Sequence, residues 1–65
     1  MKKKLIEKYE AKAKIFKALS HPTRVFLLEE LSKGEKCVCE LTALVGDDIT
    51  TVSKHLSIMK EAGIL

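Results

Sequence analysis

Two cysteines separated by a single valine are the residues of this chain best suited to chemistry. Cys37 and Cys39 are its only cysteines. Thiolates bind soft, thiophilic metal ions, and a helix N-terminus lowers the pKa of a thiol, which favours the ligating form. An ordinary structural disulfide between them is disfavoured because the ring would be too small. We therefore expect thiol or metal chemistry here; the alternative is that one or both are small core side chains.

A second candidate site is the polar segment that follows Asp47 and Asp48. Apolar residues recur there at three- and four-residue steps, which places them on one side of a helix that packs inward. These residues are Ile49, Val52, Leu56 and Met59. The opposite side carries Thr50, Thr51, Lys54, Ser57 and Ile58. Hydroxyls and a cation on one helix face suit phosphates and base edges in a DNA groove, so nucleic-acid binding is the first function to test.

Four helices are expected to position these residues. Pattern and propensity predict a first helix over residues 5–19 and a second from 22 to about 33, with Pro22 in its first turn. A third helix spans about 38–45 and stops at Gly46. Asp48 is the expected N-cap of a fourth helix, which ends near residue 62. Ile64 and Leu65 resemble the start of a strand.

The core is expected to draw on the second and third helices, and the second should be almost wholly packed. Its inner residues are predicted to be Val25, Phe26, Leu27, Leu28 and Leu31. Those of the third helix are Val38, Leu41, Leu44 and Val45. The third helix, a tight turn and the fourth helix have helix-turn-helix spacing over about 38–62. We therefore predict an all-α fold in one domain spanning residues 1–65.

Size and composition narrow the function classes. A chain of 65 residues makes a marginal monomer, so help from a partner subunit is expected. The net charge of +3 favours anionic partners, although the N-terminal lysines can equally form a solvated face. No apolar run approaches the roughly 20 residues that cross a bilayer, so we expect a cytoplasmic protein without membrane contact. No catalytic residue set or phosphate loop is present, so an enzyme is not expected.

Three ordered motifs resemble the ArsR/SmtB family of winged-helix repressors. They are SHPTR at residues 20–24, CVCEL at 37–41 and TVSKHL at 51–56. The resemblance implies a homodimer that occupies a double-stranded DNA operator and leaves it when a metal or metalloid binds. The chain matches the N-terminal two-thirds of that family and stops before the wing and the last helix. Without these parts, Ile6, Tyr9, Phe16 and Leu65 are expected to be partly exposed.

The resemblance makes Cys37 and Cys39 the metal ligands and implies arsenite, antimonite, cadmium or lead as the inducer. No cofactor is expected for DNA binding. Arsenite takes three thiolates, so the third must come from a small-molecule thiol, another subunit or a further cysteine; His21, Tyr9 or a carboxylate are weaker candidates. Residues two apart on a helix point about 200° from each other, so both sulfurs can hold one ion only if Cys37 precedes the helix or its first turn unwinds. Binding is therefore expected to distort the third helix and release DNA.

By the same resemblance the DNA contacts are expected from the fourth helix. The candidate residues are Thr50, Thr51, Ser53, Lys54 and His55, with Thr51 and Lys54 foremost. Alternatives are that Ser53 is a small packing residue and that His55 is a buried, hydrogen-bonded structural histidine. Arg24 is expected to tie helices together, and His21 to cap or orient the turn at Pro22.

Two rival functions use the same residues. One is a repressor that senses oxidants through Cys37 and Cys39 rather than metals. The other is a truncated interaction module that pairs with a full-length relative instead of reading DNA. Strong, salt-dependent operator binding by the chain alone would exclude the interaction module.

Overall fold

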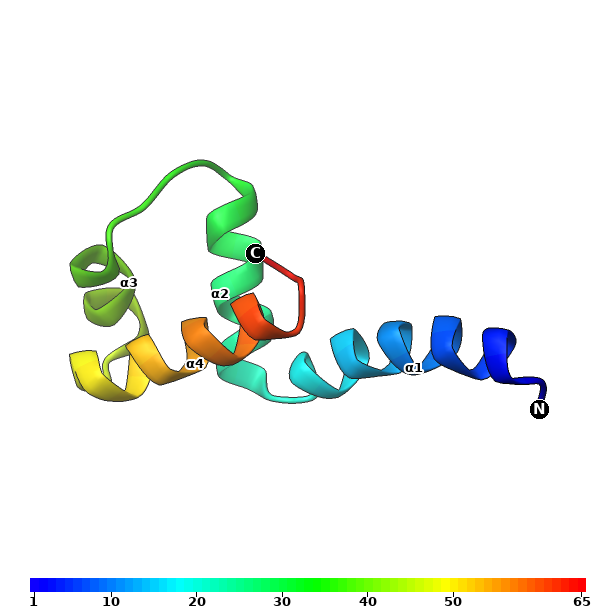
Figure 1. Cartoon of the computed structure of the whole chain (residues 1–65). Coiled ribbons are helices and arrows are strands. Elements are labelled where there is room, and N and C mark those ends of the chain that lie inside the picture. The colour runs from blue at the N-terminus through cyan, green and yellow to red at the C-terminus, as the bar shows by residue number, and fades with distance from the viewer.

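The computed structural model describes all 65 residues as four α-helices without a strand. They are α1 (Lys3–Ala18), α2 (Pro22–Ser32), α3 (Val38–Val45) and α4 (Ile49–Glu61) (Figure 1). The predicted all-α fold is confirmed, and every helix boundary lies within two residues of the expected one. No helix is long and apolar enough to cross a membrane.

Local signals explain where the helices begin and end. His21 is extended, its Nδ1 accepts a hydrogen bond from the Thr23 N–H at 3.2 Å, and Pro22 opens α2. Gly46 ends α3 with a φ of 78°, a left-handed conformation that glycine adopts without steric cost. Asp48 then caps α4, its Oδ1 accepting from the Thr51 N–H at 2.7 Å. Only residues 46–48 separate α3 from α4, which gives a helix-turn-helix.

The core lies where α2, α3 and α4 meet. Four side chains are fully buried: Leu27 of α2, Leu41 of α3, and Val52 and Met59 of α4. Partly buried residues surround them, namely Leu28, Leu31, Val45, Leu56 and Ile64. One small cluster therefore holds both helices of the helix-turn-helix against α2.

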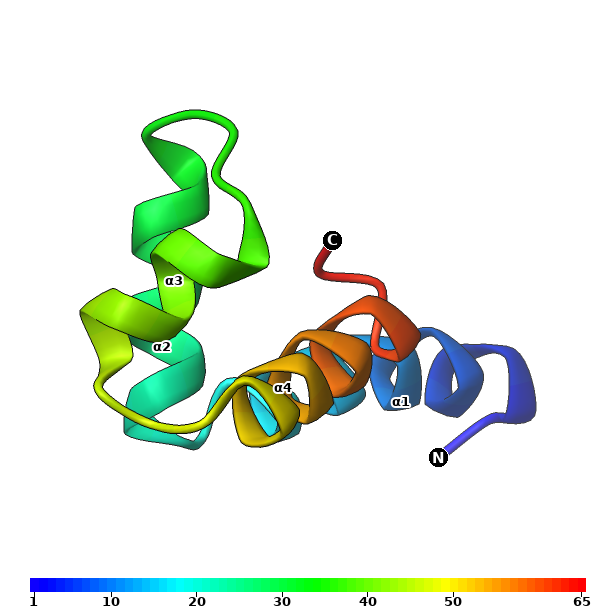
Figure 2. The ribbon, with the colours of Figure 1, turned by 90° about the vertical axis from the view of Figure 1, so that its left-hand side faces the viewer.

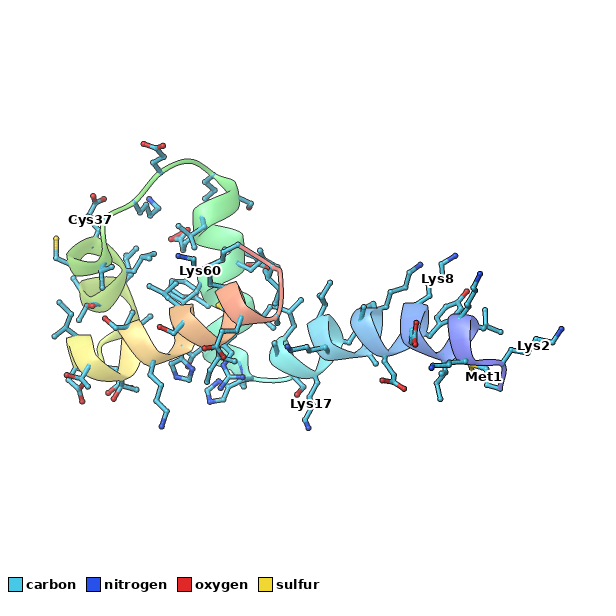
Figure 3. All side chains as sticks on the ribbon, viewed as in Figure 1. Met1, Lys2, Lys8, Lys17, Cys37 and Lys60 are labelled. Atoms are coloured by element: carbon cyan, nitrogen blue, oxygen red, sulfur yellow. The ribbon has the colours of Figure 1, made fainter.

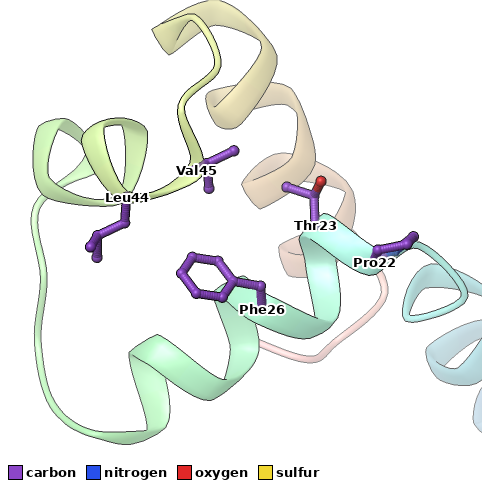
Figure 4. Close-up of a pocket in the computed structure, with 5 residues that line it drawn as sticks. All are labelled: Pro22, Thr23, Phe26, Leu44 and Val45. Atoms are coloured by element: carbon purple, nitrogen blue, oxygen red, sulfur yellow. The ribbon is translucent and has the colours of Figure 1, made fainter.

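The core is smaller than the sequence pattern predicts. Ile49 was expected to pack inward, yet its side chain is 54% exposed. In α2 only Leu27 and Glu30 are buried, so the expectation of an almost wholly packed helix is wrong. Phe26 and Leu44 are likewise exposed, and they line a shallow apolar pocket between α2 and α3 (Figure 4). The reason is geometric, because three short helices around one point cover only one side of each helix.

The expected strand at the C-terminal end is also wrong. Gly63 has a φ of 87°, and the Ile64 N–H donates to the Met59 carbonyl at 3.0 Å, which wraps the chain around the end of α4. Ile64 then packs on the core. A strand requires a neighbouring strand for its backbone hydrogen bonds, and the structure contains none.

Helix α1 runs outward from the body and roughly continues the line of α4 (Figures 1 and 2). Its only buried residue is Ala18, at the end nearest the body. The expected exposure of Ile6, Tyr9 and Phe16 is confirmed, with Phe16 at 73%. The molecule is consequently elongated, with a longest dimension of 45 Å.

Candidate nucleic-acid interface and metal site

The outer face of α4 presents a short polar surface. Thr50, Ser53 and Lys54 are all exposed in the first half of the helix, as is Ser57 one turn beyond. The exposure of Ser53 argues against the alternative that it is a packing residue between helices. The side chains of Thr50, Ser53 and Lys54 are available to phosphates or base edges, and their contact with DNA stays a prediction.

Thr51 lies on the flank of that surface and is bound to the helix cap. Its side chain is half-buried, and its hydroxyl donates to Asp48 Oδ2 at 3.1 Å. Hydrogen bonds from the Thr51 backbone N–H and then from its hydroxyl lower the pKa of the Asp48 carboxyl. Thr51 therefore has a capping role that the sequence pattern did not predict. Its DNA contact also stays a prediction.

His55 belongs to a polar cluster that joins three helices. Arg24 Nε donates to His55 Nδ1 at 3.1 Å, and Arg24 Nη1 donates to the Ala18 carbonyl at 3.2 Å. The rings of His21 and His55 lie 4.6 Å apart, tilted by 57°. The expected role of Arg24 in tying helices together is confirmed, since it links α2 to the end of α1 and to α4. His55 is hydrogen-bonded but only half-buried, which favours the alternative of a structural histidine in part, and its DNA contact stays a prediction.

This cluster predicts a loss of stability in mild acid. Burial, followed by the nearby His21 and Arg24 charges, lowers the pKa of His55 below its ordinary 6.5. The folded chain therefore binds fewer protons at His55 than the unfolded chain does. The stability contributed by the neutral ring is complete above the unfolded pKa and is lost as pH falls through the folded pKa. Urea unfolding at about pH 7.5 and about pH 5 will show a lower free energy of unfolding at the acid end.

A His55→Gln variant provides the control for that titration. Glutamine keeps an acceptor oxygen for Arg24 but does not ionise in this range. We expect its unfolding free energy to depend less on pH than that of the unsubstituted chain. Equal pH dependence in the two proteins would assign the effect to other groups.

The two cysteines come together at the start of α3. Cys37 is the N-cap residue, with an extended backbone at φ −78° and ψ 158°, and Cys39 is the second residue of the helix. Their Sγ atoms lie 2.6 Å apart, and both residues are exposed. Figure 3 shows Cys37 at the outer edge of the molecule, where α3 begins. Its backbone N–H donates to Glu40 Oε1 at 3.4 Å.

This geometry decides among the expectations for the cysteines. Their exposure excludes the alternative that they are core side chains. Cys37 precedes the helix, which is one of the two arrangements expected to bring both sulfurs together, so the first turn of α3 need not unwind for them to meet. The expected fall in thiol pKa is wrong for Cys37: hydrogen bonding with the Cys39 thiol raises its pKa and outweighs the Glu40 backbone N–H, which favours the thiolate.

The two cysteine sulfurs provide some, but not all, of the ligands that a thiophilic ion needs. Two adjacent sulfurs are the ligands that soft ions prefer. No three His, Cys, Asp or Glu side chains come together in a group that could hold a metal ion. The His21 ring lies beside His55 and its Nδ1 accepts from Thr23 in the α2 cap, and it does not form a group with the two cysteines. The chain therefore supplies two thiols, and any further ligand must come from outside these residues.

The part of the chain that contains the helix-turn-helix and both cysteines is similar to known proteins. The family model for bacterial regulatory proteins of the arsR family matches residues 21–65, which include α2, α3 and α4. This chain belongs to the arsR family. The matched region contains the candidate DNA-binding residues and both cysteines.

Curated relatives of this arsR-family chain include named regulators. An uncharacterized HTH-type transcriptional regulator of Methanocaldococcus jannaschii is 44% identical over 61 residues, covering 92% of this chain and 68% of the relative. A cadmium resistance transcriptional regulatory protein homolog of Staphylococcus aureus is 45% identical, covering 80% and 44%. The arsenical resistance operon repressor of Bacillus subtilis is 37% identical, covering 98% and 59%. The chain thus spans from about half to two thirds of these relatives' lengths. No solved structure matches it significantly.

Proposed function

We propose that this arsR-family chain is a DNA-binding transcriptional repressor whose α4 enters the major groove of an operator. The exposed Thr50, Ser53 and Lys54 support this proposal, because they form a polar surface at the start of the second helix of a helix-turn-helix. The relatives named as repressors and regulators support it as well.

We further propose that a thiophilic ion bound by Cys37 and Cys39 releases the DNA. The observation that carries this step is the pair of exposed sulfurs 2.6 Å apart at the start of α3. Relatives named for arsenical and cadmium resistance suggest arsenite or cadmium, and antimonite and lead are further candidates because they are also thiophilic. An added thiol such as glutathione, a second copy of the chain or a further cysteine would complete the ligand set.

The packing provides a route from the thiols to α4. Leu41 lies two residues after Cys39, is fully buried, and shares the core with Val52 and Met59 of α4. A change in the first turn of α3 therefore acts on side chains that position α4. A ligand that favours one arrangement of α3 will shift the DNA affinity by the difference in its binding free energy between the two arrangements.

A second copy of the chain is part of this proposal. Leu5, Ile6, Tyr9 and Phe16 leave an apolar stripe on α1 that nothing in one chain covers. Such a stripe suits the matching stripe of another copy, and a homodimer would present two copies of α4 to successive half-sites on DNA.

The test is a DNA titration with and without ions. Fluorescence anisotropy would follow binding to a duplex that the reduced chain selects from a random-sequence pool. We expect salt-dependent binding, and a loss of affinity of about 5- to 150-fold, the usual range of allosteric coupling, with at least one of the four ions. Magnesium is the control, because a hard ion has no preference for thiols. Binding that no thiophilic ion weakens would overturn the metal-response step.

The same sulfur geometry favours one alternative, an oxidant-sensing repressor. Hydrogen peroxide would oxidise the two thiols to a disulfide and be reduced to two waters. The small ring would strain this disulfide and make it easy to reduce, which suits a reversible sensor rather than a structural bond. Release of DNA by peroxide, reversed by dithiothreitol and unaffected by the ions, would support this alternative. Release by ions under reducing conditions would support metal sensing.

A further inference from the structure

The charge of this chain is divided unevenly between α1 and the body. Residues 1–19 contain seven lysines and two glutamates, a net charge of +5, whereas residues 20–65 have a net charge of −2. Within the body, residues 20–65, Arg24 is hydrogen-bonded to His55, and Lys33 forms an ion pair with Glu30 at 2.8 Å. Neutralisation of phosphates supplies much of the affinity of proteins for DNA. The body alone is therefore poorly equipped for that electrostatic attraction.

Two lysines of α1 lie on the same face of the molecule as Lys54. Lys14 and Lys17 line a hollow together with Ile58 and Glu61 of α4. Ile58 follows Lys54 by four residues and Glu61 follows it by seven, so all three share one side of α4. The lysines thus extend the exposed surface of α4 onto α1.

The distances suit a DNA backbone beside the groove. Seven residues of helix span about 10 Å from Lys54 to Glu61, and the major groove is about 12 Å wide. With the first half of α4 in the groove, the hollow comes near the strand that borders it. Besides the two lysines, Arg24 and Glu61 line the hollow, which leaves a net charge of +2 there.

We propose that Lys14 and Lys17 of α1 contact the phosphates of the DNA strand bordering the groove that α4 occupies. The inference rests on the proposed DNA binding and adds a second contact surface outside the helix-turn-helix. Lys8 and Lys12 do not share it. Lys8 lies nine residues from Lys17, which is two and a half helical turns, and Figure 3 shows these two side chains on opposite sides of α1.

The test compares two double variants with equal charge loss. Lys14→Gln/Lys17→Gln removes the proposed contacts, and Lys8→Gln/Lys12→Gln removes two charges from the opposite side. Anisotropy with a mixed-sequence duplex across a potassium chloride series gives the slope of log affinity against log salt. We expect the first variant to lower the magnitude of that slope by about 1.8 per bound chain and the second to leave it nearly unchanged. Circular dichroism would verify that both variants keep their helical content.

The remaining outcomes separate this inference from the proposed function. Equal slope changes in both variants would show that only net charge matters and would overturn the inference. An unchanged slope in the Lys14→Gln/Lys17→Gln variant would overturn it as well, while leaving DNA binding in place. An unsubstituted chain that binds no duplex at any salt concentration would instead overturn the proposed function, and the inference with it.

Discussion

Replacement of both cysteines by serine will leave the chain bound to DNA at ion concentrations that release the unsubstituted protein. Serine keeps the size and exposure of Cys37 and Cys39 but offers no thiolate to a soft ion. In the unsubstituted chain we expect ions to lower the DNA affinity by about 5- to 150-fold. In the Cys37→Ser/Cys39→Ser variant we expect no such loss of affinity. Anisotropy titrations with arsenite, antimonite, cadmium and lead will measure it.

Ion-free DNA affinity provides the control for this variant. Both cysteines lie at the surface and outside the core, so their loss should not change the fold or the α4 surface. We expect the variant to match the unsubstituted chain in helical content and in affinity without ions. If ions release the variant as readily as the unsubstituted chain, the ion site lies elsewhere in the protein.

Truncation of Leu41 to alanine will remove a large share of the free energy of unfolding. Its side chain is only 1% exposed and lies among Leu27, Val52 and Met59. A buried Leu→Ala change costs about 2–5 kcal/mol, while a domain of this size has a total stability of roughly 3–10 kcal/mol. Urea unfolding followed by circular dichroism will show a sharply lower midpoint, and DNA binding should weaken because α4 loses its support.

Leu44 is a matched control on the same helix. The Leu44→Ala substitution removes the same atoms as Leu41→Ala, but the Leu44 side chain is 53% exposed. The expected loss of unfolding free energy is therefore below about 1 kcal/mol. Similar losses for Leu41→Ala and Leu44→Ala would mean that the core does not lie where α3 meets α4. A difference of several-fold between them would support the described packing.

Local sequence signals were sufficient to predict the helices and the position of Cys37 immediately before α3. Pro22, Gly46 and Asp48 act within one turn of their own position, so their effect on helix ends can be read directly from the sequence. The same holds for Cys37, whose place before the helix was one of the two arrangements that would let both sulfurs meet.

Features that depend on the whole fold were not predictable in this way. The pattern treats every apolar position of a stripe alike, but Ile49 and Phe26 are exposed because no neighbouring helix reaches them. The bond from Arg24 to His55 joins residues 31 positions apart, and neither residue type signals the other. For His55 the sequence offered both a surface and a structural role, and packing alone could favour one.

The exposure of helix α1 affects how this protein unfolds locally. Its only buried side chain is at one end, and most of its length contacts nothing else in the chain. In proteins most of the stability of a helix comes from tertiary packing, which α1 largely lacks. The backbone amides of α1 will therefore exchange with solvent through local fraying, whereas those around Leu41 and Val52 will exchange only when the whole body unfolds. Helix α1 and the body of α2, α3 and α4 should therefore unfold as two separate cooperative units. Any partner that packs on α1 will slow the local unfolding of that helix.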